Sequence, residues 1–191
     1  DMIGDPGGHQ DQYAVAIGGL NRIEFSAKRV SVKRLAVSRE RLRAFKDTIC
    51  LFFLGLERFS GDILAEQKAR HKENHEQLVR TLELVDLTES VLVSNEDFSA
   101  FGTLLDEAWA LKKSFATGIS NKFVDDVYKE ARSAGAWGGK LLGAGSAGFM
   151  MLSAPPELHA QIEKRLPKLL KVPFAFEESG SVLLSNGIDN D

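Results

Sequence analysis

Apolar residues recur every three or four positions through much of this sequence, which is the spacing of one buried face of an α-helix. The clearest run lies between residues 98 and 115, and its apolar positions are Phe98, Phe101, Leu104, Ala108, Leu111 and Phe115. The same period predicts a helix over residues 121–135 and a long helical region over residues 60–92 that is broken once. A further helix is expected to begin near Pro155 and to end or kink at Pro167.

Shorter apolar segments predict the strands. A continuous apolar run over residues 49–56 is typical of a buried strand, and two more strands are expected at 139–143 and 148–153. Residues 173–185 predict a closing hairpin or a pair of short strands. Near the start of the chain, partial alternation of apolar and polar residues predicts two strands within residues 21–37.

From about residue 45 onward the expected order is strand, helices, two strands, helix, strand. This is a βαββαβ order with extra helices, and it predicts an α+β fold of the ferredoxin-like type. The first part of the chain does not fit this order and resembles the tail of another domain. We therefore expect the 191 residues to divide into residues 1–40, the end of a preceding domain, and residues 41–191, an α+β domain.

Composition and charge restrict the class of partner. Hydrophobic residues make up 43% of the chain and charged residues 27%, as in ordinary globular proteins. The 24 basic and 27 acidic residues give a net charge of −3, which argues against nucleic acid or an anionic membrane as a partner. A small anion remains a possible ligand, because a local group of backbone amides can bind one without a positive net charge.

Metal and membrane sites are not expected from the sequence. The single cysteine, Cys50, allows neither an internal disulfide nor a zinc cluster and is expected to be a buried thiol. His71 and His75 have the i, i+4 spacing of a metal-binding pair, but their charged surroundings favour a solvated face. No apolar run approaches the ~18 residues of a membrane span. We therefore expect a cytoplasmic protein without a metal site of its own.

A glycine-rich segment, G-D-P-G-G-H-Q-D-Q, leads into a predicted short helix near Asp11. Gly7, Gly8 and Gln10 would allow this loop to approach a ligand closely. An acidic residue at a helix start commonly caps the helix or interacts with its dipole. The alternative is a carboxylate near a substrate hydroxyl, where it accepts or orients the proton during phosphoryl transfer.

A second glycine-rich segment, G-G-K-L-L-G-A-G-S-A-G, lies between two predicted strands. Lys140 precedes the glycines, so the segment is not a Walker A loop, and no helix follows, so it is not a dinucleotide-binding fingerprint. It is either a tight connection between strands or a loop whose amides at Gly143, Gly145 and Gly148 are open to a ligand.

Together, the two segments resemble those of the GHMP kinase superfamily, the small-molecule kinases named for galactose, homoserine, mevalonate and phosphomevalonate. The stretch K-L-L-G-A-G-S-A-G is similar to a late loop of that family, which lies close to nucleotide and substrate. The resemblance implies such contacts for Lys140, Gly143, Ala144, Gly145, Ser146 and Gly148. The stretch G-G-H-Q-D-Q-Y-A is similar to the segment that carries the catalytic carboxylate in the family's sugar kinases, which implies that role for Asp11.

Within the superfamily, the chain is most similar to the D-glycero-D-manno-heptose 7-phosphate kinases, in segments such as FFLGLERFSGDILAEQ and ISNKFVDDVYKEARSAGAWGGKLLGAG. The resemblance implies a GHMP kinase C-terminal domain preceded by the tail of the N-terminal domain. It also implies an enzyme that uses ATP and Mg²⁺ to phosphorylate a sugar phosphate, a heptose 7-phosphate at its anomeric hydroxyl. The alternative is a non-catalytic ferredoxin-like module that binds a small ligand or a partner.

The sequence departs from the family pattern in two places. Ser146 and Ala147 stand where the late loop usually has glycines, and a left-handed backbone at Ala147 would cost about 1 kcal/mol or more. The family's principal phosphate loop, of the type P-x-x-x-G-L-G-S-S, is not found before Asp11. We therefore expect a C-terminal portion of a kinase, inactive alone, with an exposed apolar surface that favours association, including a homo-oligomer.

Other polar residues leave two readings open. Arg58, Lys112 and Lys113 could bind a sugar phosphate, and surface solvation is the alternative for each. Ser120 and Asn121 either cap the following helix or face the substrate.

Overall fold

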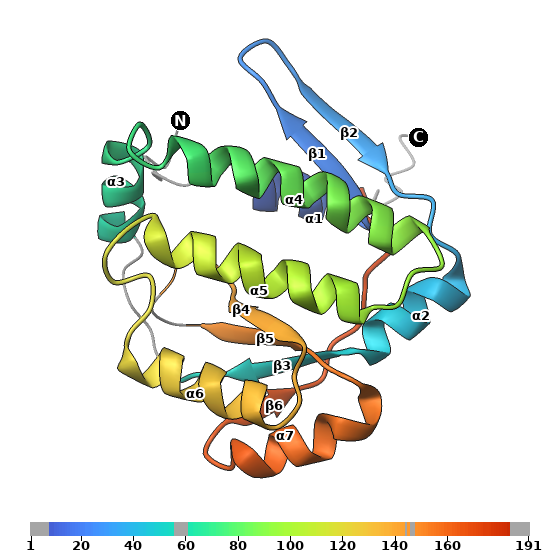
Figure 1. The fold of residues 1–191 in the computed structure, drawn as a ribbon. Helices are drawn as coiled ribbons and strands as arrows, with labels where there is room; N and C mark the ends of the chain where they lie inside the picture. Colours follow the sequence, from blue (N-terminus) through green and yellow to red (C-terminus); the bar gives the residue numbers. More distant parts are fainter. Residues whose placement is uncertain (1–7, 56–60, 144, 146–147, 184–191) are drawn as a thin grey trace, which may run out of the picture. The chain divides into compact units, whose positions relative to one another are not determined.

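The computed structural model describes residues 8–55, 61–143, 145 and 148–183, and these form two compact units (Figure 1). The larger unit comprises residues 37–174, and the smaller unit comprises residues 8–36 together with 175–183. Each unit contains a β-sheet of its own.

The sheet of the larger unit contains β3 (Ile49–Phe53), β4 (Gly138–Leu141), β5 (Phe149–Ser153) and β6 (Leu170–Val172). The order across the sheet is β4-β5-β3-β6, and all neighbours are antiparallel. The first of these strands thus lies between the third and the fourth, with the second at an edge, as in a βαββαβ ferredoxin-like sheet. The predicted α+β fold is confirmed.

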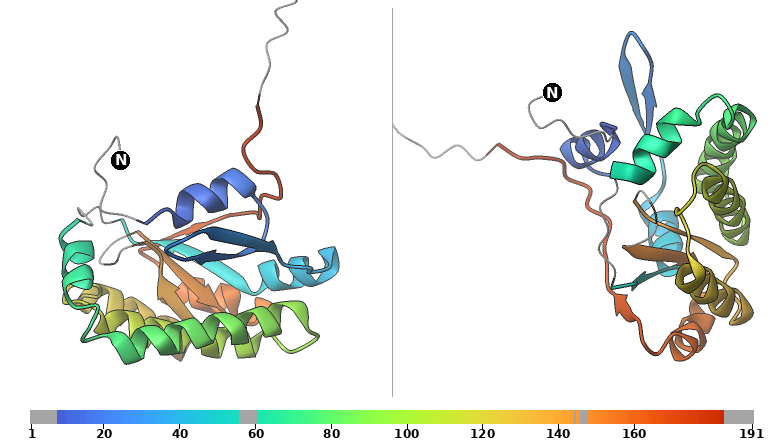
Figure 2. Two further views of the ribbon diagram at one scale, coloured as in Figure 1. Left: turned by 90° about the horizontal axis from the view of Figure 1, so that it is seen from above. Right: turned by 90° about the vertical axis from the view of Figure 1, so that its left-hand side faces the viewer.

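The helices of the larger unit are α2 (Arg39–Asp47), α3 (Gly61–Ala69), α4 (His75–Val93), α5 (Ser99–Ser114), α6 (Lys122–Ser133) and α7 (His159–Arg165). Figure 2 shows α5, α6 and α7 on one side of the sheet, and α4 packs along α5. The predicted break in the helical region over residues 60–92 falls between α3 and α4. As predicted, α7 ends before Pro167.

One face of this sheet forms the centre of the hydrophobic core. Leu141, Met150 and Phe52 stand side by side on neighbouring strands, and each has an exposed fraction of 0%. Burying each such side chain stabilises the fold by about 1.5–3 kcal/mol. β4 approaches α5 closely because Gly138 has no side chain, since a Cβ there would overlap the carbonyl oxygen of Gly102 on α5. Side chains at the end of β4 are thereby brought towards the last turn of α5.

The smaller unit contains α1 (Gln10–Ile17) and an antiparallel pair, β1 (Asn21–Phe25) and β2 (Val30–Arg34). The ring of Tyr13 on α1 meets the ring of Phe25 on β1 edge to face, with centroids 5.6 Å apart. The chain returns to this unit at its far end, where the amide of Gly19 donates to the Glu177 carbonyl at 2.8 Å. Residues far apart in the sequence therefore build one small unit.

The predicted hairpin over residues 173–185 is wrong for its described part, because residues 173–183 contain neither helix nor strand. Their polar backbone groups find partners in the smaller unit instead, as when the amide of Ser181 donates to the Ala16 carbonyl at 3.1 Å. The domain boundary expected between residues 40 and 41 stays a prediction; the larger unit begins at residue 37. Of the helices that the structure describes, none has the length and apolarity that crossing a membrane requires.

Candidate active site

The predicted catalytic carboxylate, Asp11, lies in the first turn of α1. Its side chain is exposed, at the end of a helix where the dipole favours a negative charge. Gly8 and Gln10 are exposed beside it, whereas Gly7 lies outside the described residues. The helix ends at Gly18, which has a φ of 66°. The position leaves the carboxylate accessible, and its catalytic role stays a prediction.

The glycine loop, residues 142–148, connects β4 to β5. Its described glycines, Gly143, Gly145 and Gly148, have φ values of 78°, 129° and 106°, in the region that other residues adopt only under strain. The loop is closed at its base by the amide of Leu142, which donates to the Phe149 carbonyl at 2.8 Å. Ala144, Ser146 and Ala147 lie outside the described residues. The positive φ angles at these three positions therefore require glycine, because other residues would be strained there.

Gly145 is held against the segment that joins α5 to α6. A Cβ on Gly145 would lie 2.9 Å from both the Cα and the carbonyl oxygen of Ile119. Because Ile119 itself has an exposed fraction of 0%, it has little freedom to move away. The middle of the glycine loop is thus fixed by a close contact between two backbones.

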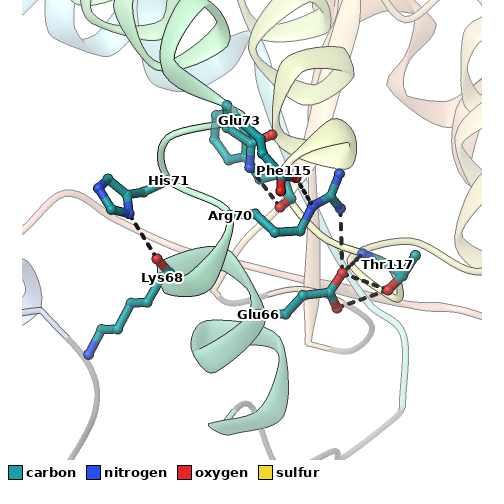
Figure 3. Close-up of polar contacts among 8 residues, drawn as sticks. Glu66, Lys68, Arg70, His71, Glu73, Phe115 and Thr117 are labelled. Atoms are coloured by element: carbon teal, nitrogen blue, oxygen red, sulfur yellow. Dashed lines mark hydrogen bonds and ion pairs between the residues drawn. The ribbon is translucent and has the colours of Figure 1, made fainter.

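The α5–α6 segment is in turn fixed by polar contacts from α3 and from the turn that joins α3 to α4 (Figure 3). Glu66 accepts hydrogen bonds from the amide and the hydroxyl of Thr117, at 2.8 and 2.7 Å, and Arg70 lies 3.5 Å from the same carboxylate. The Thr117 hydrogen bonds, followed by Arg70, lower the pKa of Glu66. Asn74 donates to the Phe115 carbonyl at 2.9 Å. These contacts support the backbone against which Gly145 packs.

Asn121 caps α6, because its side chain accepts a hydrogen bond from the amide of Val124 at 3.0 Å. Ser120 donates to Asp125 in the first turn of the same helix, at 2.8 Å. The capping interpretation is therefore confirmed for Asn121. Lys113 interacts with the same carboxylate, because its ammonium lies 3.5 Å from Asp125.

Two lysines lie at the start of the glycine loop. Lys112, in the last turn of α5, donates a hydrogen bond from Nζ to the carbonyl oxygen of Gly143. Burial, and then the positive charge of Lys140, lower the pKa of Lys112 to about 8. Burial also lowers the pKa of Lys140, on β4. The sequence indicated each lysine separately, but it did not indicate that the charge of Lys140 acts on Lys112.

The remaining candidates do not add to this site. Cys50 is buried as expected, and burial raises its pKa to about 11. His71 is exposed, with Nδ1 3.1 Å from the Lys68 carbonyl, and Figure 3 shows it on the other side of α3 from Glu66. Over the described ranges, no group of three or more His, Cys, Asp or Glu residues is arranged for a metal ion. Arg58 lies outside the described residues.

The structure therefore brings together the glycines, Lys140 and Lys112 in the larger unit. Asp11, Gly8 and Gln10 belong to the smaller unit.

Comparison with known proteins assigns the larger unit to a family. The family described as GHMP kinases C terminal matches residues 84–171, which run from α4 through the glycine loop to β6. A D-glycero-alpha-D-manno-heptose 7-phosphate kinase of Campylobacter jejuni is 30% identical over 168 residues, which are 87% of this chain and 50% of that kinase.

Solved structures agree with this assignment. A D-glycero-D-manno-heptose 1-phosphate kinase of Bacteroides thetaiotaomicron has a TM-score of 0.62 at 26% identity, over 94% of this chain and 50% of that one. The galactokinase of Lactococcus lactis, complexed with galactose, shares the fold, with a TM-score of 0.67 at 18% identity over 95% of this chain and 57% of that one. The chain spans about half the length of the heptose kinases that it matches. The larger unit contains a GHMP kinase C-terminal domain.

Proposed function

We propose that this chain is the C-terminal part of an ATP-dependent sugar kinase that phosphorylates a heptose 7-phosphate at its anomeric hydroxyl. The observation that carries the proposal is the glycine loop after β4, where left-handed glycines lie beside two half-buried lysines. Backbone amides and ammonium groups in such an arrangement suit the negative charge of phosphoryl groups. The choice of a heptose phosphate is supported by the similarity to the Campylobacter jejuni kinase over 87% of the chain.

In this proposal Asp11 accepts or orients the proton of the attacking sugar hydroxyl, with Gly7, Gly8 and Gln10 around it. The glycine loop, including Ala144 and Ser146, closes around the substrate and the phosphates. Bound ATP with Mg²⁺ supplies the phosphoryl group, and we assign no metal ligand within the described residues because no suitable cluster is found among them. Catalysis of this kind consists mainly of positioning and charge neutralisation.

The role of Asp11 is tested in the whole protein that contains this chain. Asp11→Asn should lower kcat by about 10²- to 10⁴-fold in an assay of ADP release with heptose 7-phosphate. Glu76→Gln is the matched control, because Glu76 is also an exposed carboxylate in the first turn of a helix, α4. A kcat that falls equally in both variants, or stays normal in Asp11→Asn, contradicts the role of Asp11.

The substrate is tested by comparing kcat/KM for heptose 7-phosphate, galactose and mevalonate in the same assay. We expect heptose 7-phosphate to be preferred by at least about 10²-fold, because a site that binds a phosphate discriminates strongly against sugars without one. A preference for galactose or mevalonate would refute heptose 7-phosphate as the substrate, while the kinase activity itself would still be supported.

The chain of 191 residues by itself should release no ADP above background. Turnover near ~1 s⁻¹ would contradict the proposal that this chain is only a part of the kinase.

A further inference from the structure

Helix α4 has an apolar surface that its neighbour α5 does not cover. α4 packs along α5 (Figure 1) and buries side chains such as Leu84. By the turn of 100° per residue, five exposed apolar side chains gather on another side of the helix. They are between 41% and 63% exposed, and we call them the α4 stripe: Leu78, Val79, Leu82, Val85 and Val93. The apolar surface of α4 is therefore wider than packing on one helix requires.

Charged residues of opposite sign lie at the two ends of the α4 stripe. At its N-terminal end, His75 lies on the same side of the helix, and Lys72 precedes it in the turn before α4. At its C-terminal end, Asp86 and Glu89 lie on this side. The other two acidic residues of α4 point to other sides of the helix, by the same 100° turn. The stripe is thus basic at its start, apolar at its centre and acidic towards its end.

This pattern is complementary to itself. His75 lies seven residues before Leu82, and Glu89 lies seven residues after it. In an antiparallel pair of α4 helices that cross at Leu82, each His75 would lie beside the Glu89 of the other copy. Along one helix the same two residues are about 21 Å apart, so they do not pair within one chain. A surface that matches its own copy in this way is what a two-fold dimer requires.

We propose that the α4 stripe is the interface of a homodimer, in which two α4 helices pack antiparallel about a two-fold axis at Leu82. The apolar side chains at the centre leave water, and Val79 of one copy faces Val85 of the other. An anionic membrane does not suit this surface, because Asp86 and Glu89 lie within it. The proposal does not depend on the kinase activity, since it involves no residue of the proposed site.

The size of the stripe predicts the strength of the dimer. α4 has 19 residues and is about 28 Å long, and a helix with its side chains is about 10 Å wide. This strip is smaller than the roughly 800 Å² that each partner buries in a stable complex of standard size. The dimer should therefore be weak and should dissociate on dilution.

The first test measures the dimer dissociation constant by sedimentation velocity. The chain should change from monomer to dimer between about 1 µM and 1 mM. Leu82→Lys should raise the constant about 100-fold or more, because it places two ammonium groups at the axis. Leu87→Lys is the matched control, since Leu87 is an exposed leucine of α4 that lies outside the stripe, and it should change the constant by about threefold or less. A monomer at every concentration, or an equal effect of both substitutions, overturns the proposal.

The second test exchanges the charges across the proposed axis. His75→Glu and Glu89→Lys should each weaken the dimer about tenfold, because each places like charges together at two symmetric contacts. The double variant should recover the wild-type constant within about threefold, since opposite charges face each other again. Absence of recovery contradicts the antiparallel register. Circular dichroism verifies that each variant is folded.

The third test uses the whole kinase that contains this chain. Leu82→Cys should form a disulfide-linked dimer under mild oxidation, because the two-fold axis brings the two new thiols together, whereas Leu87→Cys should not. The native Cys50 is buried and does not compete. If the isolated chain dimerises while the whole kinase stays monomeric and forms no such disulfide, the remainder of the kinase covers the stripe, and the proposal is wrong.

Discussion

Replacing Lys112 with methionine should stabilise the fold while it abolishes phosphate binding. Burial and the neighbouring Lys140 lower the pKa of Lys112 from 10.5 to about 8. One pKa unit corresponds to about 1.4 kcal/mol, so below pH 8 the ammonium is less favourable in the folded chain than in the unfolded chain by about 3 kcal/mol. Methionine removes this penalty but also loses the hydrogen bond to Gly143, worth about 1–1.5 kcal/mol. The net expectation is stabilisation by about 1–2 kcal/mol at pH 7.

The pH dependence of this difference has a defined sign. Below pH 8 Lys112 is protonated in both the folded and the unfolded chain, and the penalty is complete. Between about pH 8 and 10.5 the folded chain releases this proton while the unfolded chain keeps it, so the free energy of unfolding of the wild type rises with pH. Methionine does not titrate. The gap between the variant and the wild type should therefore close as the pH increases from 8 to 10.

The assay is urea unfolding of both proteins at pH 7 and pH 10, with Lys113→Met as the matched control. Lys113 is exposed and lies 3.5 Å from Asp125, so its replacement should change stability by about 0.5 kcal/mol or less. Inorganic phosphate at a saturating concentration should stabilise the wild type and leave Lys112→Met unaffected. A Lys112→Met variant that is less stable than the wild type at pH 7, or a gap that does not change with pH, would refute this reasoning.

Three further substitutions test the supports of the site and the exposed surface. Gly145→Ala should lower the free energy of unfolding in urea by about 2 kcal/mol or more, because left-handed strain adds to a Cβ 2.9 Å from Ile119. Gly143→Ala, with open space around it, should cost only the strain. Equal losses of stability in the two variants would contradict the contact between Gly145 and Ile119. Asn121→Ala should cost about 1 kcal/mol through loss of the α6 cap, seen as a lower thermal midpoint, and an unchanged midpoint would contradict the cap. Leu82 on α4 is 63% exposed, so Leu82→Lys should reduce self-association in sedimentation velocity, and the same distribution of species in both proteins would exclude this helix from the contact.

The hydrophobic period predicted where α5 lies better than it predicted which face is buried. The expected helix over residues 98–115 agrees with α5, but the most buried side chains include Phe101, Leu105 and Trp109. Leu104 and Ala108, which the period placed on the same face, are only partly buried. The physical reason is that α5 has two neighbours, the sheet on one side and α4 on another. A single apolar stripe cannot indicate how a helix is divided between two partners.

The glycine loop could be predicted from the sequence because its requirement is local, whereas the lysine pair could not. Lys140 on β4 can influence the charge of Lys112 because α5 lies unusually close to β4, and that distance depends on Gly102 and Gly138 facing each other. A glycine inside an otherwise helical pattern was the available signal, since such a residue commonly marks close packing. The partner of Gly102 could not be identified from the sequence, because it lies in a different element of the chain.

Lys112 and Lys113 are adjacent in the sequence, of one residue type and in one helical turn, and their environments still differ. Lys113 lies on the surface beside a carboxylate, as lysines commonly do. Lys112 is directed to the glycine loop, without an acidic partner among the described residues and beside a second lysine. If Lys112 only filled space, an apolar side chain of similar length would serve the fold better. Residues that lower stability without a structural gain are typical of functional sites. Here the half-buried lysines and the left-handed glycines are two such features in the same region. In the proposed kinase a phosphoryl group would account for both features, because it carries negative charge and accepts hydrogen bonds from backbone amides.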